Sequence, residues 1–418
     1  MVGSAPSDLR RIHRGLALRR ILVSGEVSRT SLATSLGLSQ MAASRIAREL
    51  IDAGLVEEAG FTTREAGPGR HATRLRLCDT GAYAAGIVLS AYSTEVAIVG
   101  AQGAIVARKA VELEQSNDGE AALATLSDAL LDLIALHSIP RERLIGIGIA
   151  LAANLDASRK RAVSASYLGL EPFDVVEPVE SRTGLPATAE NIVNALTLAE
   201  TSIGVVKDCE DVVVVRCATT IGATILQKGL ITRGHQHRAG RVGHLQHRPT
   251  KLTCTCDRND CLNCSASGWS VLVRQGLAEG NVYNPRHAQI YARAIDRIVD
   301  DLHRNGPSDA KLSRALKAAG GALADALLAI DQMMDPEVIL LAGSMPRIPD
   351  YMTGLEQQLG KFGSVGESTR NKVRIGEIRA VRAAAIMVLL EKVYSPNLDL
   401  AKLHDPPAVD DWMRAGAH

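Results

Sequence analysis

Four of the seven cysteines lie within one short segment, and two histidines precede them. Residues 243–264 read GHLQHRPTKLTCTCDRNDCLNC and contain Cys254, Cys256, Cys261 and Cys264. Cysteines spaced this closely suit three kinds of chemistry: disulfide bonds, a thiol redox switch or a metal site. The N-terminus has no apolar signal-peptide core, and no apolar run reaches the roughly 20 residues of a membrane helix. We therefore expect a cytoplasmic protein without a membrane partner, and in that reducing compartment clustered cysteines favour a metal.

The positive charge of the chain is concentrated in its first 80 residues. These hold 12 arginines, no lysine and eight acidic residues, whereas the whole chain of 418 residues has a net charge of +1. A basic segment attached to a mildly acidic body is typical of an appended nucleic-acid-binding domain. The composition, with 46% hydrophobic and 22% charged residues, is that of a soluble protein with two or three domains.

Residues 28–60 have the pattern of a helix-turn-helix. Apolar residues recur at helical spacing, Gly37 permits a sharp turn, and Ser39 is a suitable N-cap for a second helix that ends at Gly54. Two further short strands flank the Gly- and Arg-containing turn 67–70, which is the pattern of a two-stranded wing. The order of these elements predicts a winged helix-turn-helix that binds double-stranded DNA.

The outward face of the second predicted helix is rich in side chains that can bind DNA bases or phosphates. Arginine and glutamine make paired hydrogen bonds to base edges in the major groove. The residues that we expect to face DNA are Gln40, Met41, Ser44, Arg45 and Arg48 on this helix and Arg70 in the wing. The alternative interpretation is an ordinary helical hairpin with a solvated arginine face.

Strands and helices alternate from residue 82 onward, which predicts an α/β body. The apolar run 144–154 suits a strand covered on both faces. We expect strands within 82–90, 93–113, 144–154, 211–232 and 336–345, and helices at 119–137, 284–304, 309–334 and 381–394.

The order of motifs in this body resembles the ROK family (repressors, open reading frames, kinases). The matching stretches are GIVLS, GIGIALAAN, AENIVNA, TTIGATILQKGLITRGHQHRAGRVGH and CTC-x4-C, and the resemblance covers nearly the full length. It implies a winged helix-turn-helix at 1–78 followed by a two-lobed, actin-like and sugar-kinase-like body. Lobe 1 is then 79–200 with a C-terminal helix at 381–395, and lobe 2, at 201–380, holds a zinc loop and oligomerisation helices.

The resemblance also implies which residues bind a metal. ROK proteins carry a Gly-His pair followed by C-x-C-G-x-x-G-C, and the four ligands bind one zinc ion. The corresponding residues here are His244, Cys254, Cys256 and Cys261. Three thiolates and one imidazole are a closed tetrahedral set, as in structural zinc sites. Whether Cys264 or His247 also takes part stays open.

The kinase motifs of the family are altered in this chain. The catalytic Asp of the family's Asn-Asp pair corresponds to Ile192, which cannot accept a proton. The two glycine-rich phosphate loops align with 88–92 and 218–222, where side chains obstruct the approach of backbone amides to phosphates. We therefore expect no enzyme activity, and an ATP-dependent sugar kinase with a vestigial DNA-binding arm is the alternative.

The predicted effector pocket is altered as well. The positions that hold sugar hydroxyls in family repressors correspond to Asn191, Ile192, Arg241 and Asn263, with His244 close to the sugar. At one of these positions, Arg241 places a cation where the family repressors have a carboxylate. Two interpretations are open: sugar binding is lost, or the pocket accepts an anionic or modified sugar.

These observations together predict a ROK-type transcriptional regulator, expected to be a repressor of carbohydrate uptake or metabolism genes. It would bind a palindromic DNA operator as a homodimer or tetramer, carry a structural Zn²⁺ ion and respond to a sugar or an anionic sugar derivative. A zinc- or redox-responsive regulator that uses Cys264 is a further alternative.

Overall fold

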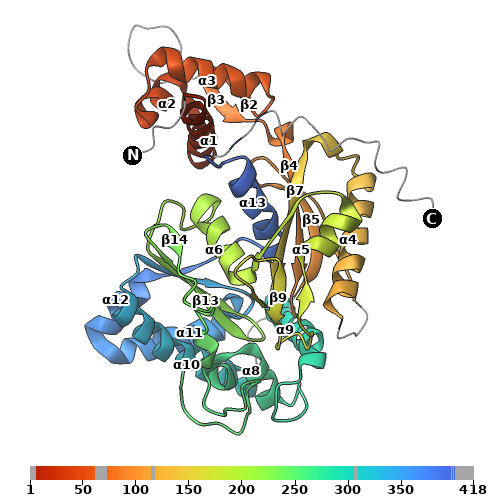
Figure 1. The fold of residues 1–418 in the computed structure, drawn as a ribbon. Coiled ribbons are helices and arrows are strands. Elements are labelled where there is room, and N and C mark those ends of the chain that lie inside the picture. Colours follow the sequence, from red (N-terminus) through yellow and green to blue (C-terminus); the bar gives the residue numbers. More distant parts are fainter. Residues whose placement is uncertain are drawn as a thin grey trace, which may run out of the picture.

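The N-terminal domain consists of three helices and a small sheet. The structure is a computed structural model and describes residues 6–61, 73–91, 93–113, 118–305, 309–396, 398 and 400. The first elements are α1 (Pro6–Ser24), β1 (Glu26–Ser28), α2 (Arg29–Leu36), α3 (Gln40–Asp52), β2 (Val56–Phe61) and β3 (Thr73–Leu77). They form the red-to-orange domain at one end of the molecule (Figure 1).

Local sequence signals explain where α2 and α3 begin and end. Gly37 follows α2 in the left-handed conformation, with φ of 64°, which a residue without a Cβ adopts at little cost. The Ser39 hydroxyl accepts a hydrogen bond from the N–H of Ala42 and caps α3. Gly54, with φ of 69°, follows the end of α3. The predicted helix-turn-helix is confirmed.

The wing contains one strand more than predicted. β3 pairs antiparallel with both β2 and β1, so that the sheet order is β1-β3-β2. β1 has only three residues, too few for an alternating pattern to be visible in the sequence, and it is held in place because Val27 is buried. The turn at 67–70 lies outside the described residues.

The body contains two five-stranded sheets of similar plan. The first has the order β11-β7-β4-β5-β6 and the second β14-β13-β12-β15-β16. In each, three strands pair antiparallel and two more extend the sheet in parallel. The strands are β4 (Tyr83–Leu89), β5 (Thr94–Gly100), β6 (Ile105–Ala110), β7 (Leu144–Leu151), β11 (Ala187–Asn191), β12 (Val212–Cys217), β13 (Ile221–Gln227), β14 (Leu230–Ile231), β15 (Val338–Ala342) and β16 (Val373–Ile375).

Two helices lie between the sheets and join the lobes. α6 (Ile192–Ile203) and α13 (Ala380–Lys392) share one hydrophobic cluster with strands of both sheets, including Val88 of β4 and Val214 of β12. α13 lies directly on the first sheet, since a Cβ on Gly86 would come within 2.2 Å of a carbonyl oxygen of α13. α4 (Gly119–Leu136) and α5 (Val176–Thr183) cover the other face of that sheet (Figure 1).

The second lobe carries the remaining helices. These are α7 (Leu262–Ala266), α8 (Gly268–Gln275), α9 (Ala288–Asn305), α10 (Ala310–Met334), α11 (Pro349–Leu359) and α12 (Gly363–Lys372). Short 3₁₀ helices lie at Asp79–Gly81, Arg141–Arg143, Val242–His244, Pro285–His287, Met345–Arg347 and Gly360–Phe362.

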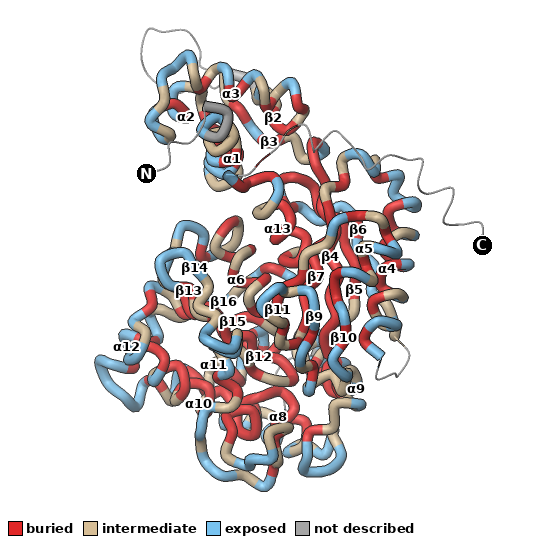
Figure 2. The backbone as a smooth tube through the Cα atoms, in the orientation of Figure 1, coloured by how far each residue is buried: buried red, intermediate tan, exposed pale blue. Residues whose placement is uncertain are grey.

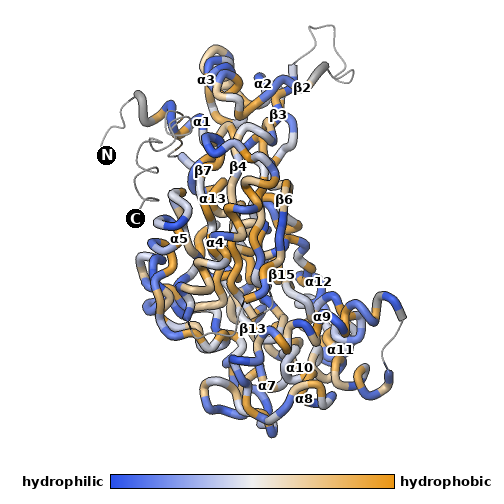
Figure 3. The backbone as a smooth tube through the Cα atoms, turned by 90° about the vertical axis from the view of Figure 1, so that its right-hand side faces the viewer, coloured by the Kyte–Doolittle hydropathy of each residue, from blue (hydrophilic) through white to orange (hydrophobic). Residues whose placement is uncertain are grey.

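Burial is continuous along the strands and falls off toward the outer helices (Figure 2), and the same strands form the hydrophobic interior seen from the side (Figure 3). None of the described helices is both long and apolar enough to cross a membrane.

A third, small sheet in the first lobe carries a loop that reaches the second. Its strands, β8 (Asn154–Leu155), β9 (Arg161–Ser164) and β10 (Phe173–Asp174), pair antiparallel in the order β10-β9-β8. The β9–β10 loop, residues 165–172, places Tyr167 against Tyr283 of the second lobe, with ring centroids 5.4 Å apart. This loop brings residues of both lobes together at the site.

Candidate functional site

The predicted DNA-facing residues lie on one face of α3. Gln40, Met41, Arg45 and Arg48 are exposed, Met41 by 76%, and Ser44 is half-buried. Arg70 lies outside the described residues. Neither Arg45 nor Arg48 forms an ion pair with any residue that the structure describes, so both guanidinium groups are available to an external anion.

The opposite side of α3 is fixed to α1. Glu49 forms ion pairs with Arg10 and Arg14 of α1, the second with an N–O distance of 2.7 Å. Ala43, Ile46, Ala47 and Leu50 are buried in the domain core. These contacts hold the exposed face of α3 in a defined orientation, which a helix that enters a DNA groove requires.

Four predicted metal ligands converge in the second lobe. The ligand atoms of His244, Cys254, Cys256 and Cys261 all lie within 4.8 Å of one another. The Nδ1 atom of His244 is 3.6 Å from Cys254 Sγ and 3.9 Å from Cys261 Sγ, and the sulfurs of Cys256 and Cys261 are 3.4 Å apart. All seven cysteines are free thiols. The arrangement can hold one metal ion, with Nδ1 as the imidazole ligand.

Backbone hydrogen bonds shape the loop that carries these cysteines. The N–H of His247 donates to the Asp260 carbonyl at 2.6 Å, and the N–H of Cys254 donates to the Arg258 carbonyl at 2.8 Å. Asp257 takes the left-handed conformation, with φ of 65°. Aspartate tolerates that conformation better than most side chains, so the loop closes although a family glycine is missing here.

The ionisation of the thiols also fits a bound cation. Hydrogen bonding from Cys264, opposed by burial, holds the pKa of Cys254 well below its ordinary value. Burial, with the neighbouring sulfurs, raises the pKa of Cys261. The cluster therefore favours the thiolate form of Cys254 and disfavours that of Cys261.

The two spare candidates, His247 and Cys264, lie outside the four-residue cluster. His247 bonds to the Ser265 hydroxyl at 3.1 Å through Nδ1 and to Asp325 at 3.3 Å through Nε2. Cys264 is fully buried and lies outside the four-residue cluster. Among the described residues, this cluster contains the four predicted ligands and neither of the spare candidates.

Tyr167 joins the metal cluster to the first lobe, and no motif or spacing in the sequence predicts this contact. Its hydroxyl is 3.1 Å from His244 Nε2, 3.6 Å from Cys254 Sγ and 2.8 Å from the Asn263 Nδ2 that donates to it. A metal bound at Nδ1 would leave the Nε2–H of His244 as the donor to this hydroxyl, which would orient the imidazole. Burial raises the pKa of Tyr167, so the hydroxyl stays protonated.

Asn263 stands behind Tyr167. It is 2% exposed, and its side-chain oxygen accepts the N–H of Ile221 at 2.8 Å. Of the four predicted pocket residues, only Asn191, Arg241 and His244 line the cavity between the lobes. Asn263 supports the tyrosine instead.

The inter-lobe cavity has a volume of about 210 Å³ and is rich in arginine. Its charged lining residues are Arg159, Arg216, Arg233, Arg241, Asp156 and Glu190. Ile192 also lines it and is 2% exposed. The Asn191 side chain caps α6 by accepting the N–H of Val193 at 2.9 Å, and it donates to the Ala153 carbonyl.

Glu190 is the centre of an ion-pair network in the cavity wall. It is 1% exposed and forms two hydrogen bonds with Arg233, and Arg159 lies 3.5 Å away. Asn194 and the N–H of Asn191 also donate to it, each at 2.8 Å. Burial opposes ionisation of this carboxyl, but Arg233 and the other donors outweigh it and hold its pKa below the ordinary value.

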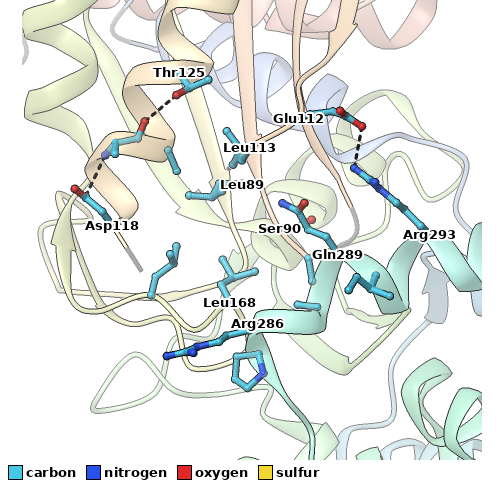
Figure 4. A pocket seen from close by; sticks show the side chains of 17 residues that line it. Leu89, Ser90, Glu112, Leu113, Asp118, Thr125, Leu168, Arg286, Gln289 and Arg293 are labelled. Carbon is cyan, nitrogen blue, oxygen red and sulfur yellow. Dashed lines mark hydrogen bonds and ion pairs between the residues drawn. The ribbon is translucent and has the colours of Figure 1, made fainter. Parts of the chain in front are cut away.

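A second hollow, of about 1010 Å³, lies between the β4–β5 turn, α4 and the start of α9 (Figure 4). The first of the altered phosphate loops borders it at Ser90. The N–H of Ser90 donates to the Ser93 carbonyl at 3.0 Å, and the N–H of Ser93 donates to the Ser90 hydroxyl at 2.9 Å. In the second loop, Ala218 N–H donates to the Thr220 carbonyl. These amides are engaged within the turns rather than directed at a phosphate.

Comparison with known proteins assigns the family. The profile of the ROK family matches residues 84–387. The chain belongs to the ROK family. Both the predicted family and the predicted α/β fold class are thereby confirmed.

The most similar curated relatives include ROK regulators of Escherichia coli (strain K12). The DNA-binding transcriptional dual regulator NagC is 24% identical over 331 residues, which is 77% of each chain. The DNA-binding transcriptional repressor Mlc is 25% identical over 357 residues, or 82% of this chain and 84% of Mlc.

Solved structures share the fold. A ROK family transcriptional regulator, a homologue of Mlc, has a TM-score of 0.71 at 21% identity and covers 95% of this chain and 99% of its own. A ROK family glucokinase from Streptomyces griseus, in complex with glucose and AMPPNP, has a TM-score of 0.58 at 18% identity and covers 73% of this chain and 98% of its own. The body fold is therefore common to ROK regulators and ROK kinases.

Proposed function

We propose that this ROK protein is a sequence-specific DNA-binding transcriptional regulator that acts as a repressor. The observation that carries the proposal is the exposed face of α3 on a winged helix-turn-helix that α1 supports. Its two arginines have no ion pair with any described residue. The similarity to NagC and Mlc supports it. A homodimer or tetramer would present two such faces to a palindromic operator.

We further propose that the chain is not a sugar kinase. Ile192 stands where a general base is needed, and a hydrocarbon side chain cannot take a proton. The hydrogen bonds within the β4–β5 and β12–β13 turns also use N–H groups that a phosphate would need. The body then serves to sense a small molecule, a sugar or an anionic sugar derivative.

The metal cluster is proposed to hold a structural zinc ion. Its ligands are three cysteines and one histidine, with no position left for substrate in a tetrahedral set. Bound zinc would supply the positive charge that the neighbouring thiolates need. The proposed domains are 1–78 for DNA binding, 79–200 with 381–395 for lobe 1, and 201–380 for lobe 2.

Footprinting on the promoter region of the protein's own gene tests the DNA proposal. We expect wild-type protein to protect a palindromic site, and Arg45→Ala to weaken specific binding by about 1–3 kcal/mol if Arg45 contacts a base. Arg297→Ala is the matched control, because Arg297 is exposed on α9 of the second lobe, and it should bind as the wild type does.

Two results would contradict the proposal. One is the absence of any protected site together with equal, non-specific binding by wild type and Arg45→Ala. The other is ATP-dependent phosphorylation of a sugar by the purified protein, which would favour the kinase alternative.

A further inference from the structure

Two crossings of the chain connect the lobes in the part that the structure describes, and they lie close together. The chain leaves the first sheet through α6 and reaches β12 of the second sheet through residues 204–211. It returns from β16 to α13 through residues 376–379. α6 and α13 share one hydrophobic cluster between the sheets. Two bodies that are connected at one place can rotate about that place, as at the hinges of other two-lobed proteins.

The side chain of Glu200 joins the two crossings. It lies in the last turn of α6 and is 1% exposed. One carboxylate oxygen accepts the N–H groups of Glu377 and Ile378, at 2.9 and 2.8 Å, and the other accepts the N–H of Val205 at 3.1 Å. These donors are backbone groups from both crossings, so the carboxylate fixes one chain segment relative to the other.

Two glycines make room for this carboxylate. A Cβ on Gly204 would collide with the Oε2 atom of Glu200, and a Cβ on Gly376 would come within 2.8 Å of the Oε1 atom. Neither glycine has a positive φ, so close approach rather than backbone conformation requires the absence of a side chain. Each crossing therefore has a glycine where it passes the Glu200 side chain.

The contacts across the cavity are of a different kind. Glu190 of lobe 1 pairs with Arg233 of lobe 2, and the hydroxyl of Tyr167 meets the His244 imidazole, in both cases through side chains. Side chains can separate without a change in the chain path, whereas the crossings are covalent. Opening of the cavity would therefore turn the lobes about the crossings that Glu200 holds.

The DNA-binding domain is packed on lobe 1 and α13. Leu18 of α1 is buried in one hydrophobic cluster with Val99 of β5 and Val388 of α13, and α13 lies next to α1 in Figure 1. The side-chain amide of Gln102, between β5 and β6, donates to the Leu77 carbonyl of the wing at 3.0 Å. A buried apolar interface of this kind holds two domains in one orientation. A change in the angle between the lobes then also changes the orientation of the exposed α3 face relative to lobe 2.

We propose that Glu200 holds the hinge between the lobes, and that lobe 2 rotates about it relative to one rigid unit. This unit consists of the DNA-binding domain, lobe 1 and α13. The inference goes beyond the proposed function, because it describes a motion of the isolated protein and requires neither an operator nor an effector.

Distances between pairs of spin labels in the full-length protein test the inference. The labels are attached to ketone-bearing amino acids, so that the native cysteines are not modified. The labelled positions, all exposed, are Met41 in the DNA-binding domain, Leu136 in lobe 1 and Met333 in lobe 2. The lobe-to-lobe distance joins Leu136 and Met333, and the domain-to-lobe distance joins Met41 and Leu136.

Glu200→Gln is the first variant. The amide has one acceptor oxygen where the carboxylate has two, so at least one crossing loses its hydrogen bond. We expect the distribution of lobe-to-lobe distances to widen about twofold relative to the wild type, because the hinge is released. The distribution of domain-to-lobe distances should stay as in the wild type.

Gly376→Ala is the second variant, because its Cβ displaces the carboxylate while Glu200 itself is kept. It should widen the same lobe-to-lobe distribution. Gly360→Ala is its matched control, since no atom lies within 4 Å of the added Cβ. Asp331→Asn controls for the loss of a buried carboxylate, because both of its side-chain partners belong to lobe 2. Neither control should alter either distribution.

Three outcomes would overturn the inference. Glu200→Gln and Gly376→Ala could both leave the lobe-to-lobe distribution as in the wild type. Asp331→Asn could widen it as much as Glu200→Gln does, which would indicate general loosening of the fold. The domain-to-lobe distribution could widen as much as the lobe-to-lobe distribution, which would exclude the rigid unit. A failure of the DNA proposal is separate from all three, because no DNA is present in these measurements.

Discussion

The metal cluster and the inter-lobe cavity share His244, yet they are assembled in different ways. All four candidate metal ligands come from residues 244–261 of the second lobe, and backbone hydrogen bonds within that segment set their spacing. The cavity is lined by both lobes, from β8 and the β9–β10 loop to α6, β12 and β13. The metal cluster is therefore a local structure, whereas the cavity exists because the two lobes pack together.

Tyr167 shows what this difference means. It belongs to the first lobe, lines the cavity, and hydrogen bonds to a metal ligand of the second lobe. A ligand that moves the lobes apart would therefore also disturb the orientation of His244. The comparison leads to four predictions. Loss of the local structure should have the largest effect, and loss of the single bridging hydroxyl the smallest.

Removal of the metal should have the largest effect. Elemental analysis should give about one zinc ion per chain. Cys256→Ser should lose the metal and lower the free energy of unfolding by about 5 kcal/mol, because metal binding at such a site contributes to folding. Cys209→Ser, at a cysteine outside the cluster, should keep both zinc and stability. Metal-free protein with an unchanged melting temperature would show that this loop needs no metal.

Breaking the cavity wall should have an intermediate effect. Glu190→Gln leaves Arg233 and Arg159 without their buried anion and should lower the free energy of unfolding by about 2–3 kcal/mol. Denaturant unfolding measures this against Glu112→Gln, which breaks the exposed pair with Arg293 shown in Figure 4 and should cost less than about 1 kcal/mol. If both variants lower the free energy of unfolding equally, Glu190 does not stabilise the cavity wall.

The pH dependence of the same pair has a definite sign. The folded-state pKa of Glu190 is lower than the ordinary 4.5, so its contribution to stability is fully present above about pH 4.5. It is lost as the pH falls through the folded-state pKa. The stability difference between wild type and Glu190→Gln should therefore shrink in acid below that pH.

Loss of the bridging hydroxyl should have the smallest effect on stability. Tyr167→Phe leaves the buried Asn263 Nδ2 without its acceptor and should cost about 1 kcal/mol. Because the hydroxyl also orients His244, zinc affinity should fall by about tenfold. Competition with a chromogenic chelator measures that affinity. Tyr394→Phe, which removes a buried hydroxyl bonded to the Ala101 carbonyl, should leave zinc affinity unchanged. If both variants lose zinc affinity to a similar extent, the Tyr167 hydroxyl does not act through His244.

Much of the fold could be predicted because its signals are local. The cap at Ser39 and the left-handed Gly37 determine how α2 is joined to α3, and the apolar runs of β7 and β15 mark strands buried on both faces. β1 was not predicted, because a strand of three residues is too short to show an alternating hydrophobic pattern. It forms a strand only through its pairing with β3.

Local patterns in the sequence predict the helix-turn-helix, the alternating α/β body and the four candidate metal ligands, because each depends on residues close together in the chain. Packing of the lobes brings Tyr167 to His244, with Asn263 behind it. It also pairs Glu190 with Arg233, whereas Arg241 has no ion pair among the described residues. Those contacts join segments up to 96 positions apart. Which side chains meet across the lobes depends on how the two sheets pack around α6 and α13, and no spacing in the sequence specifies it.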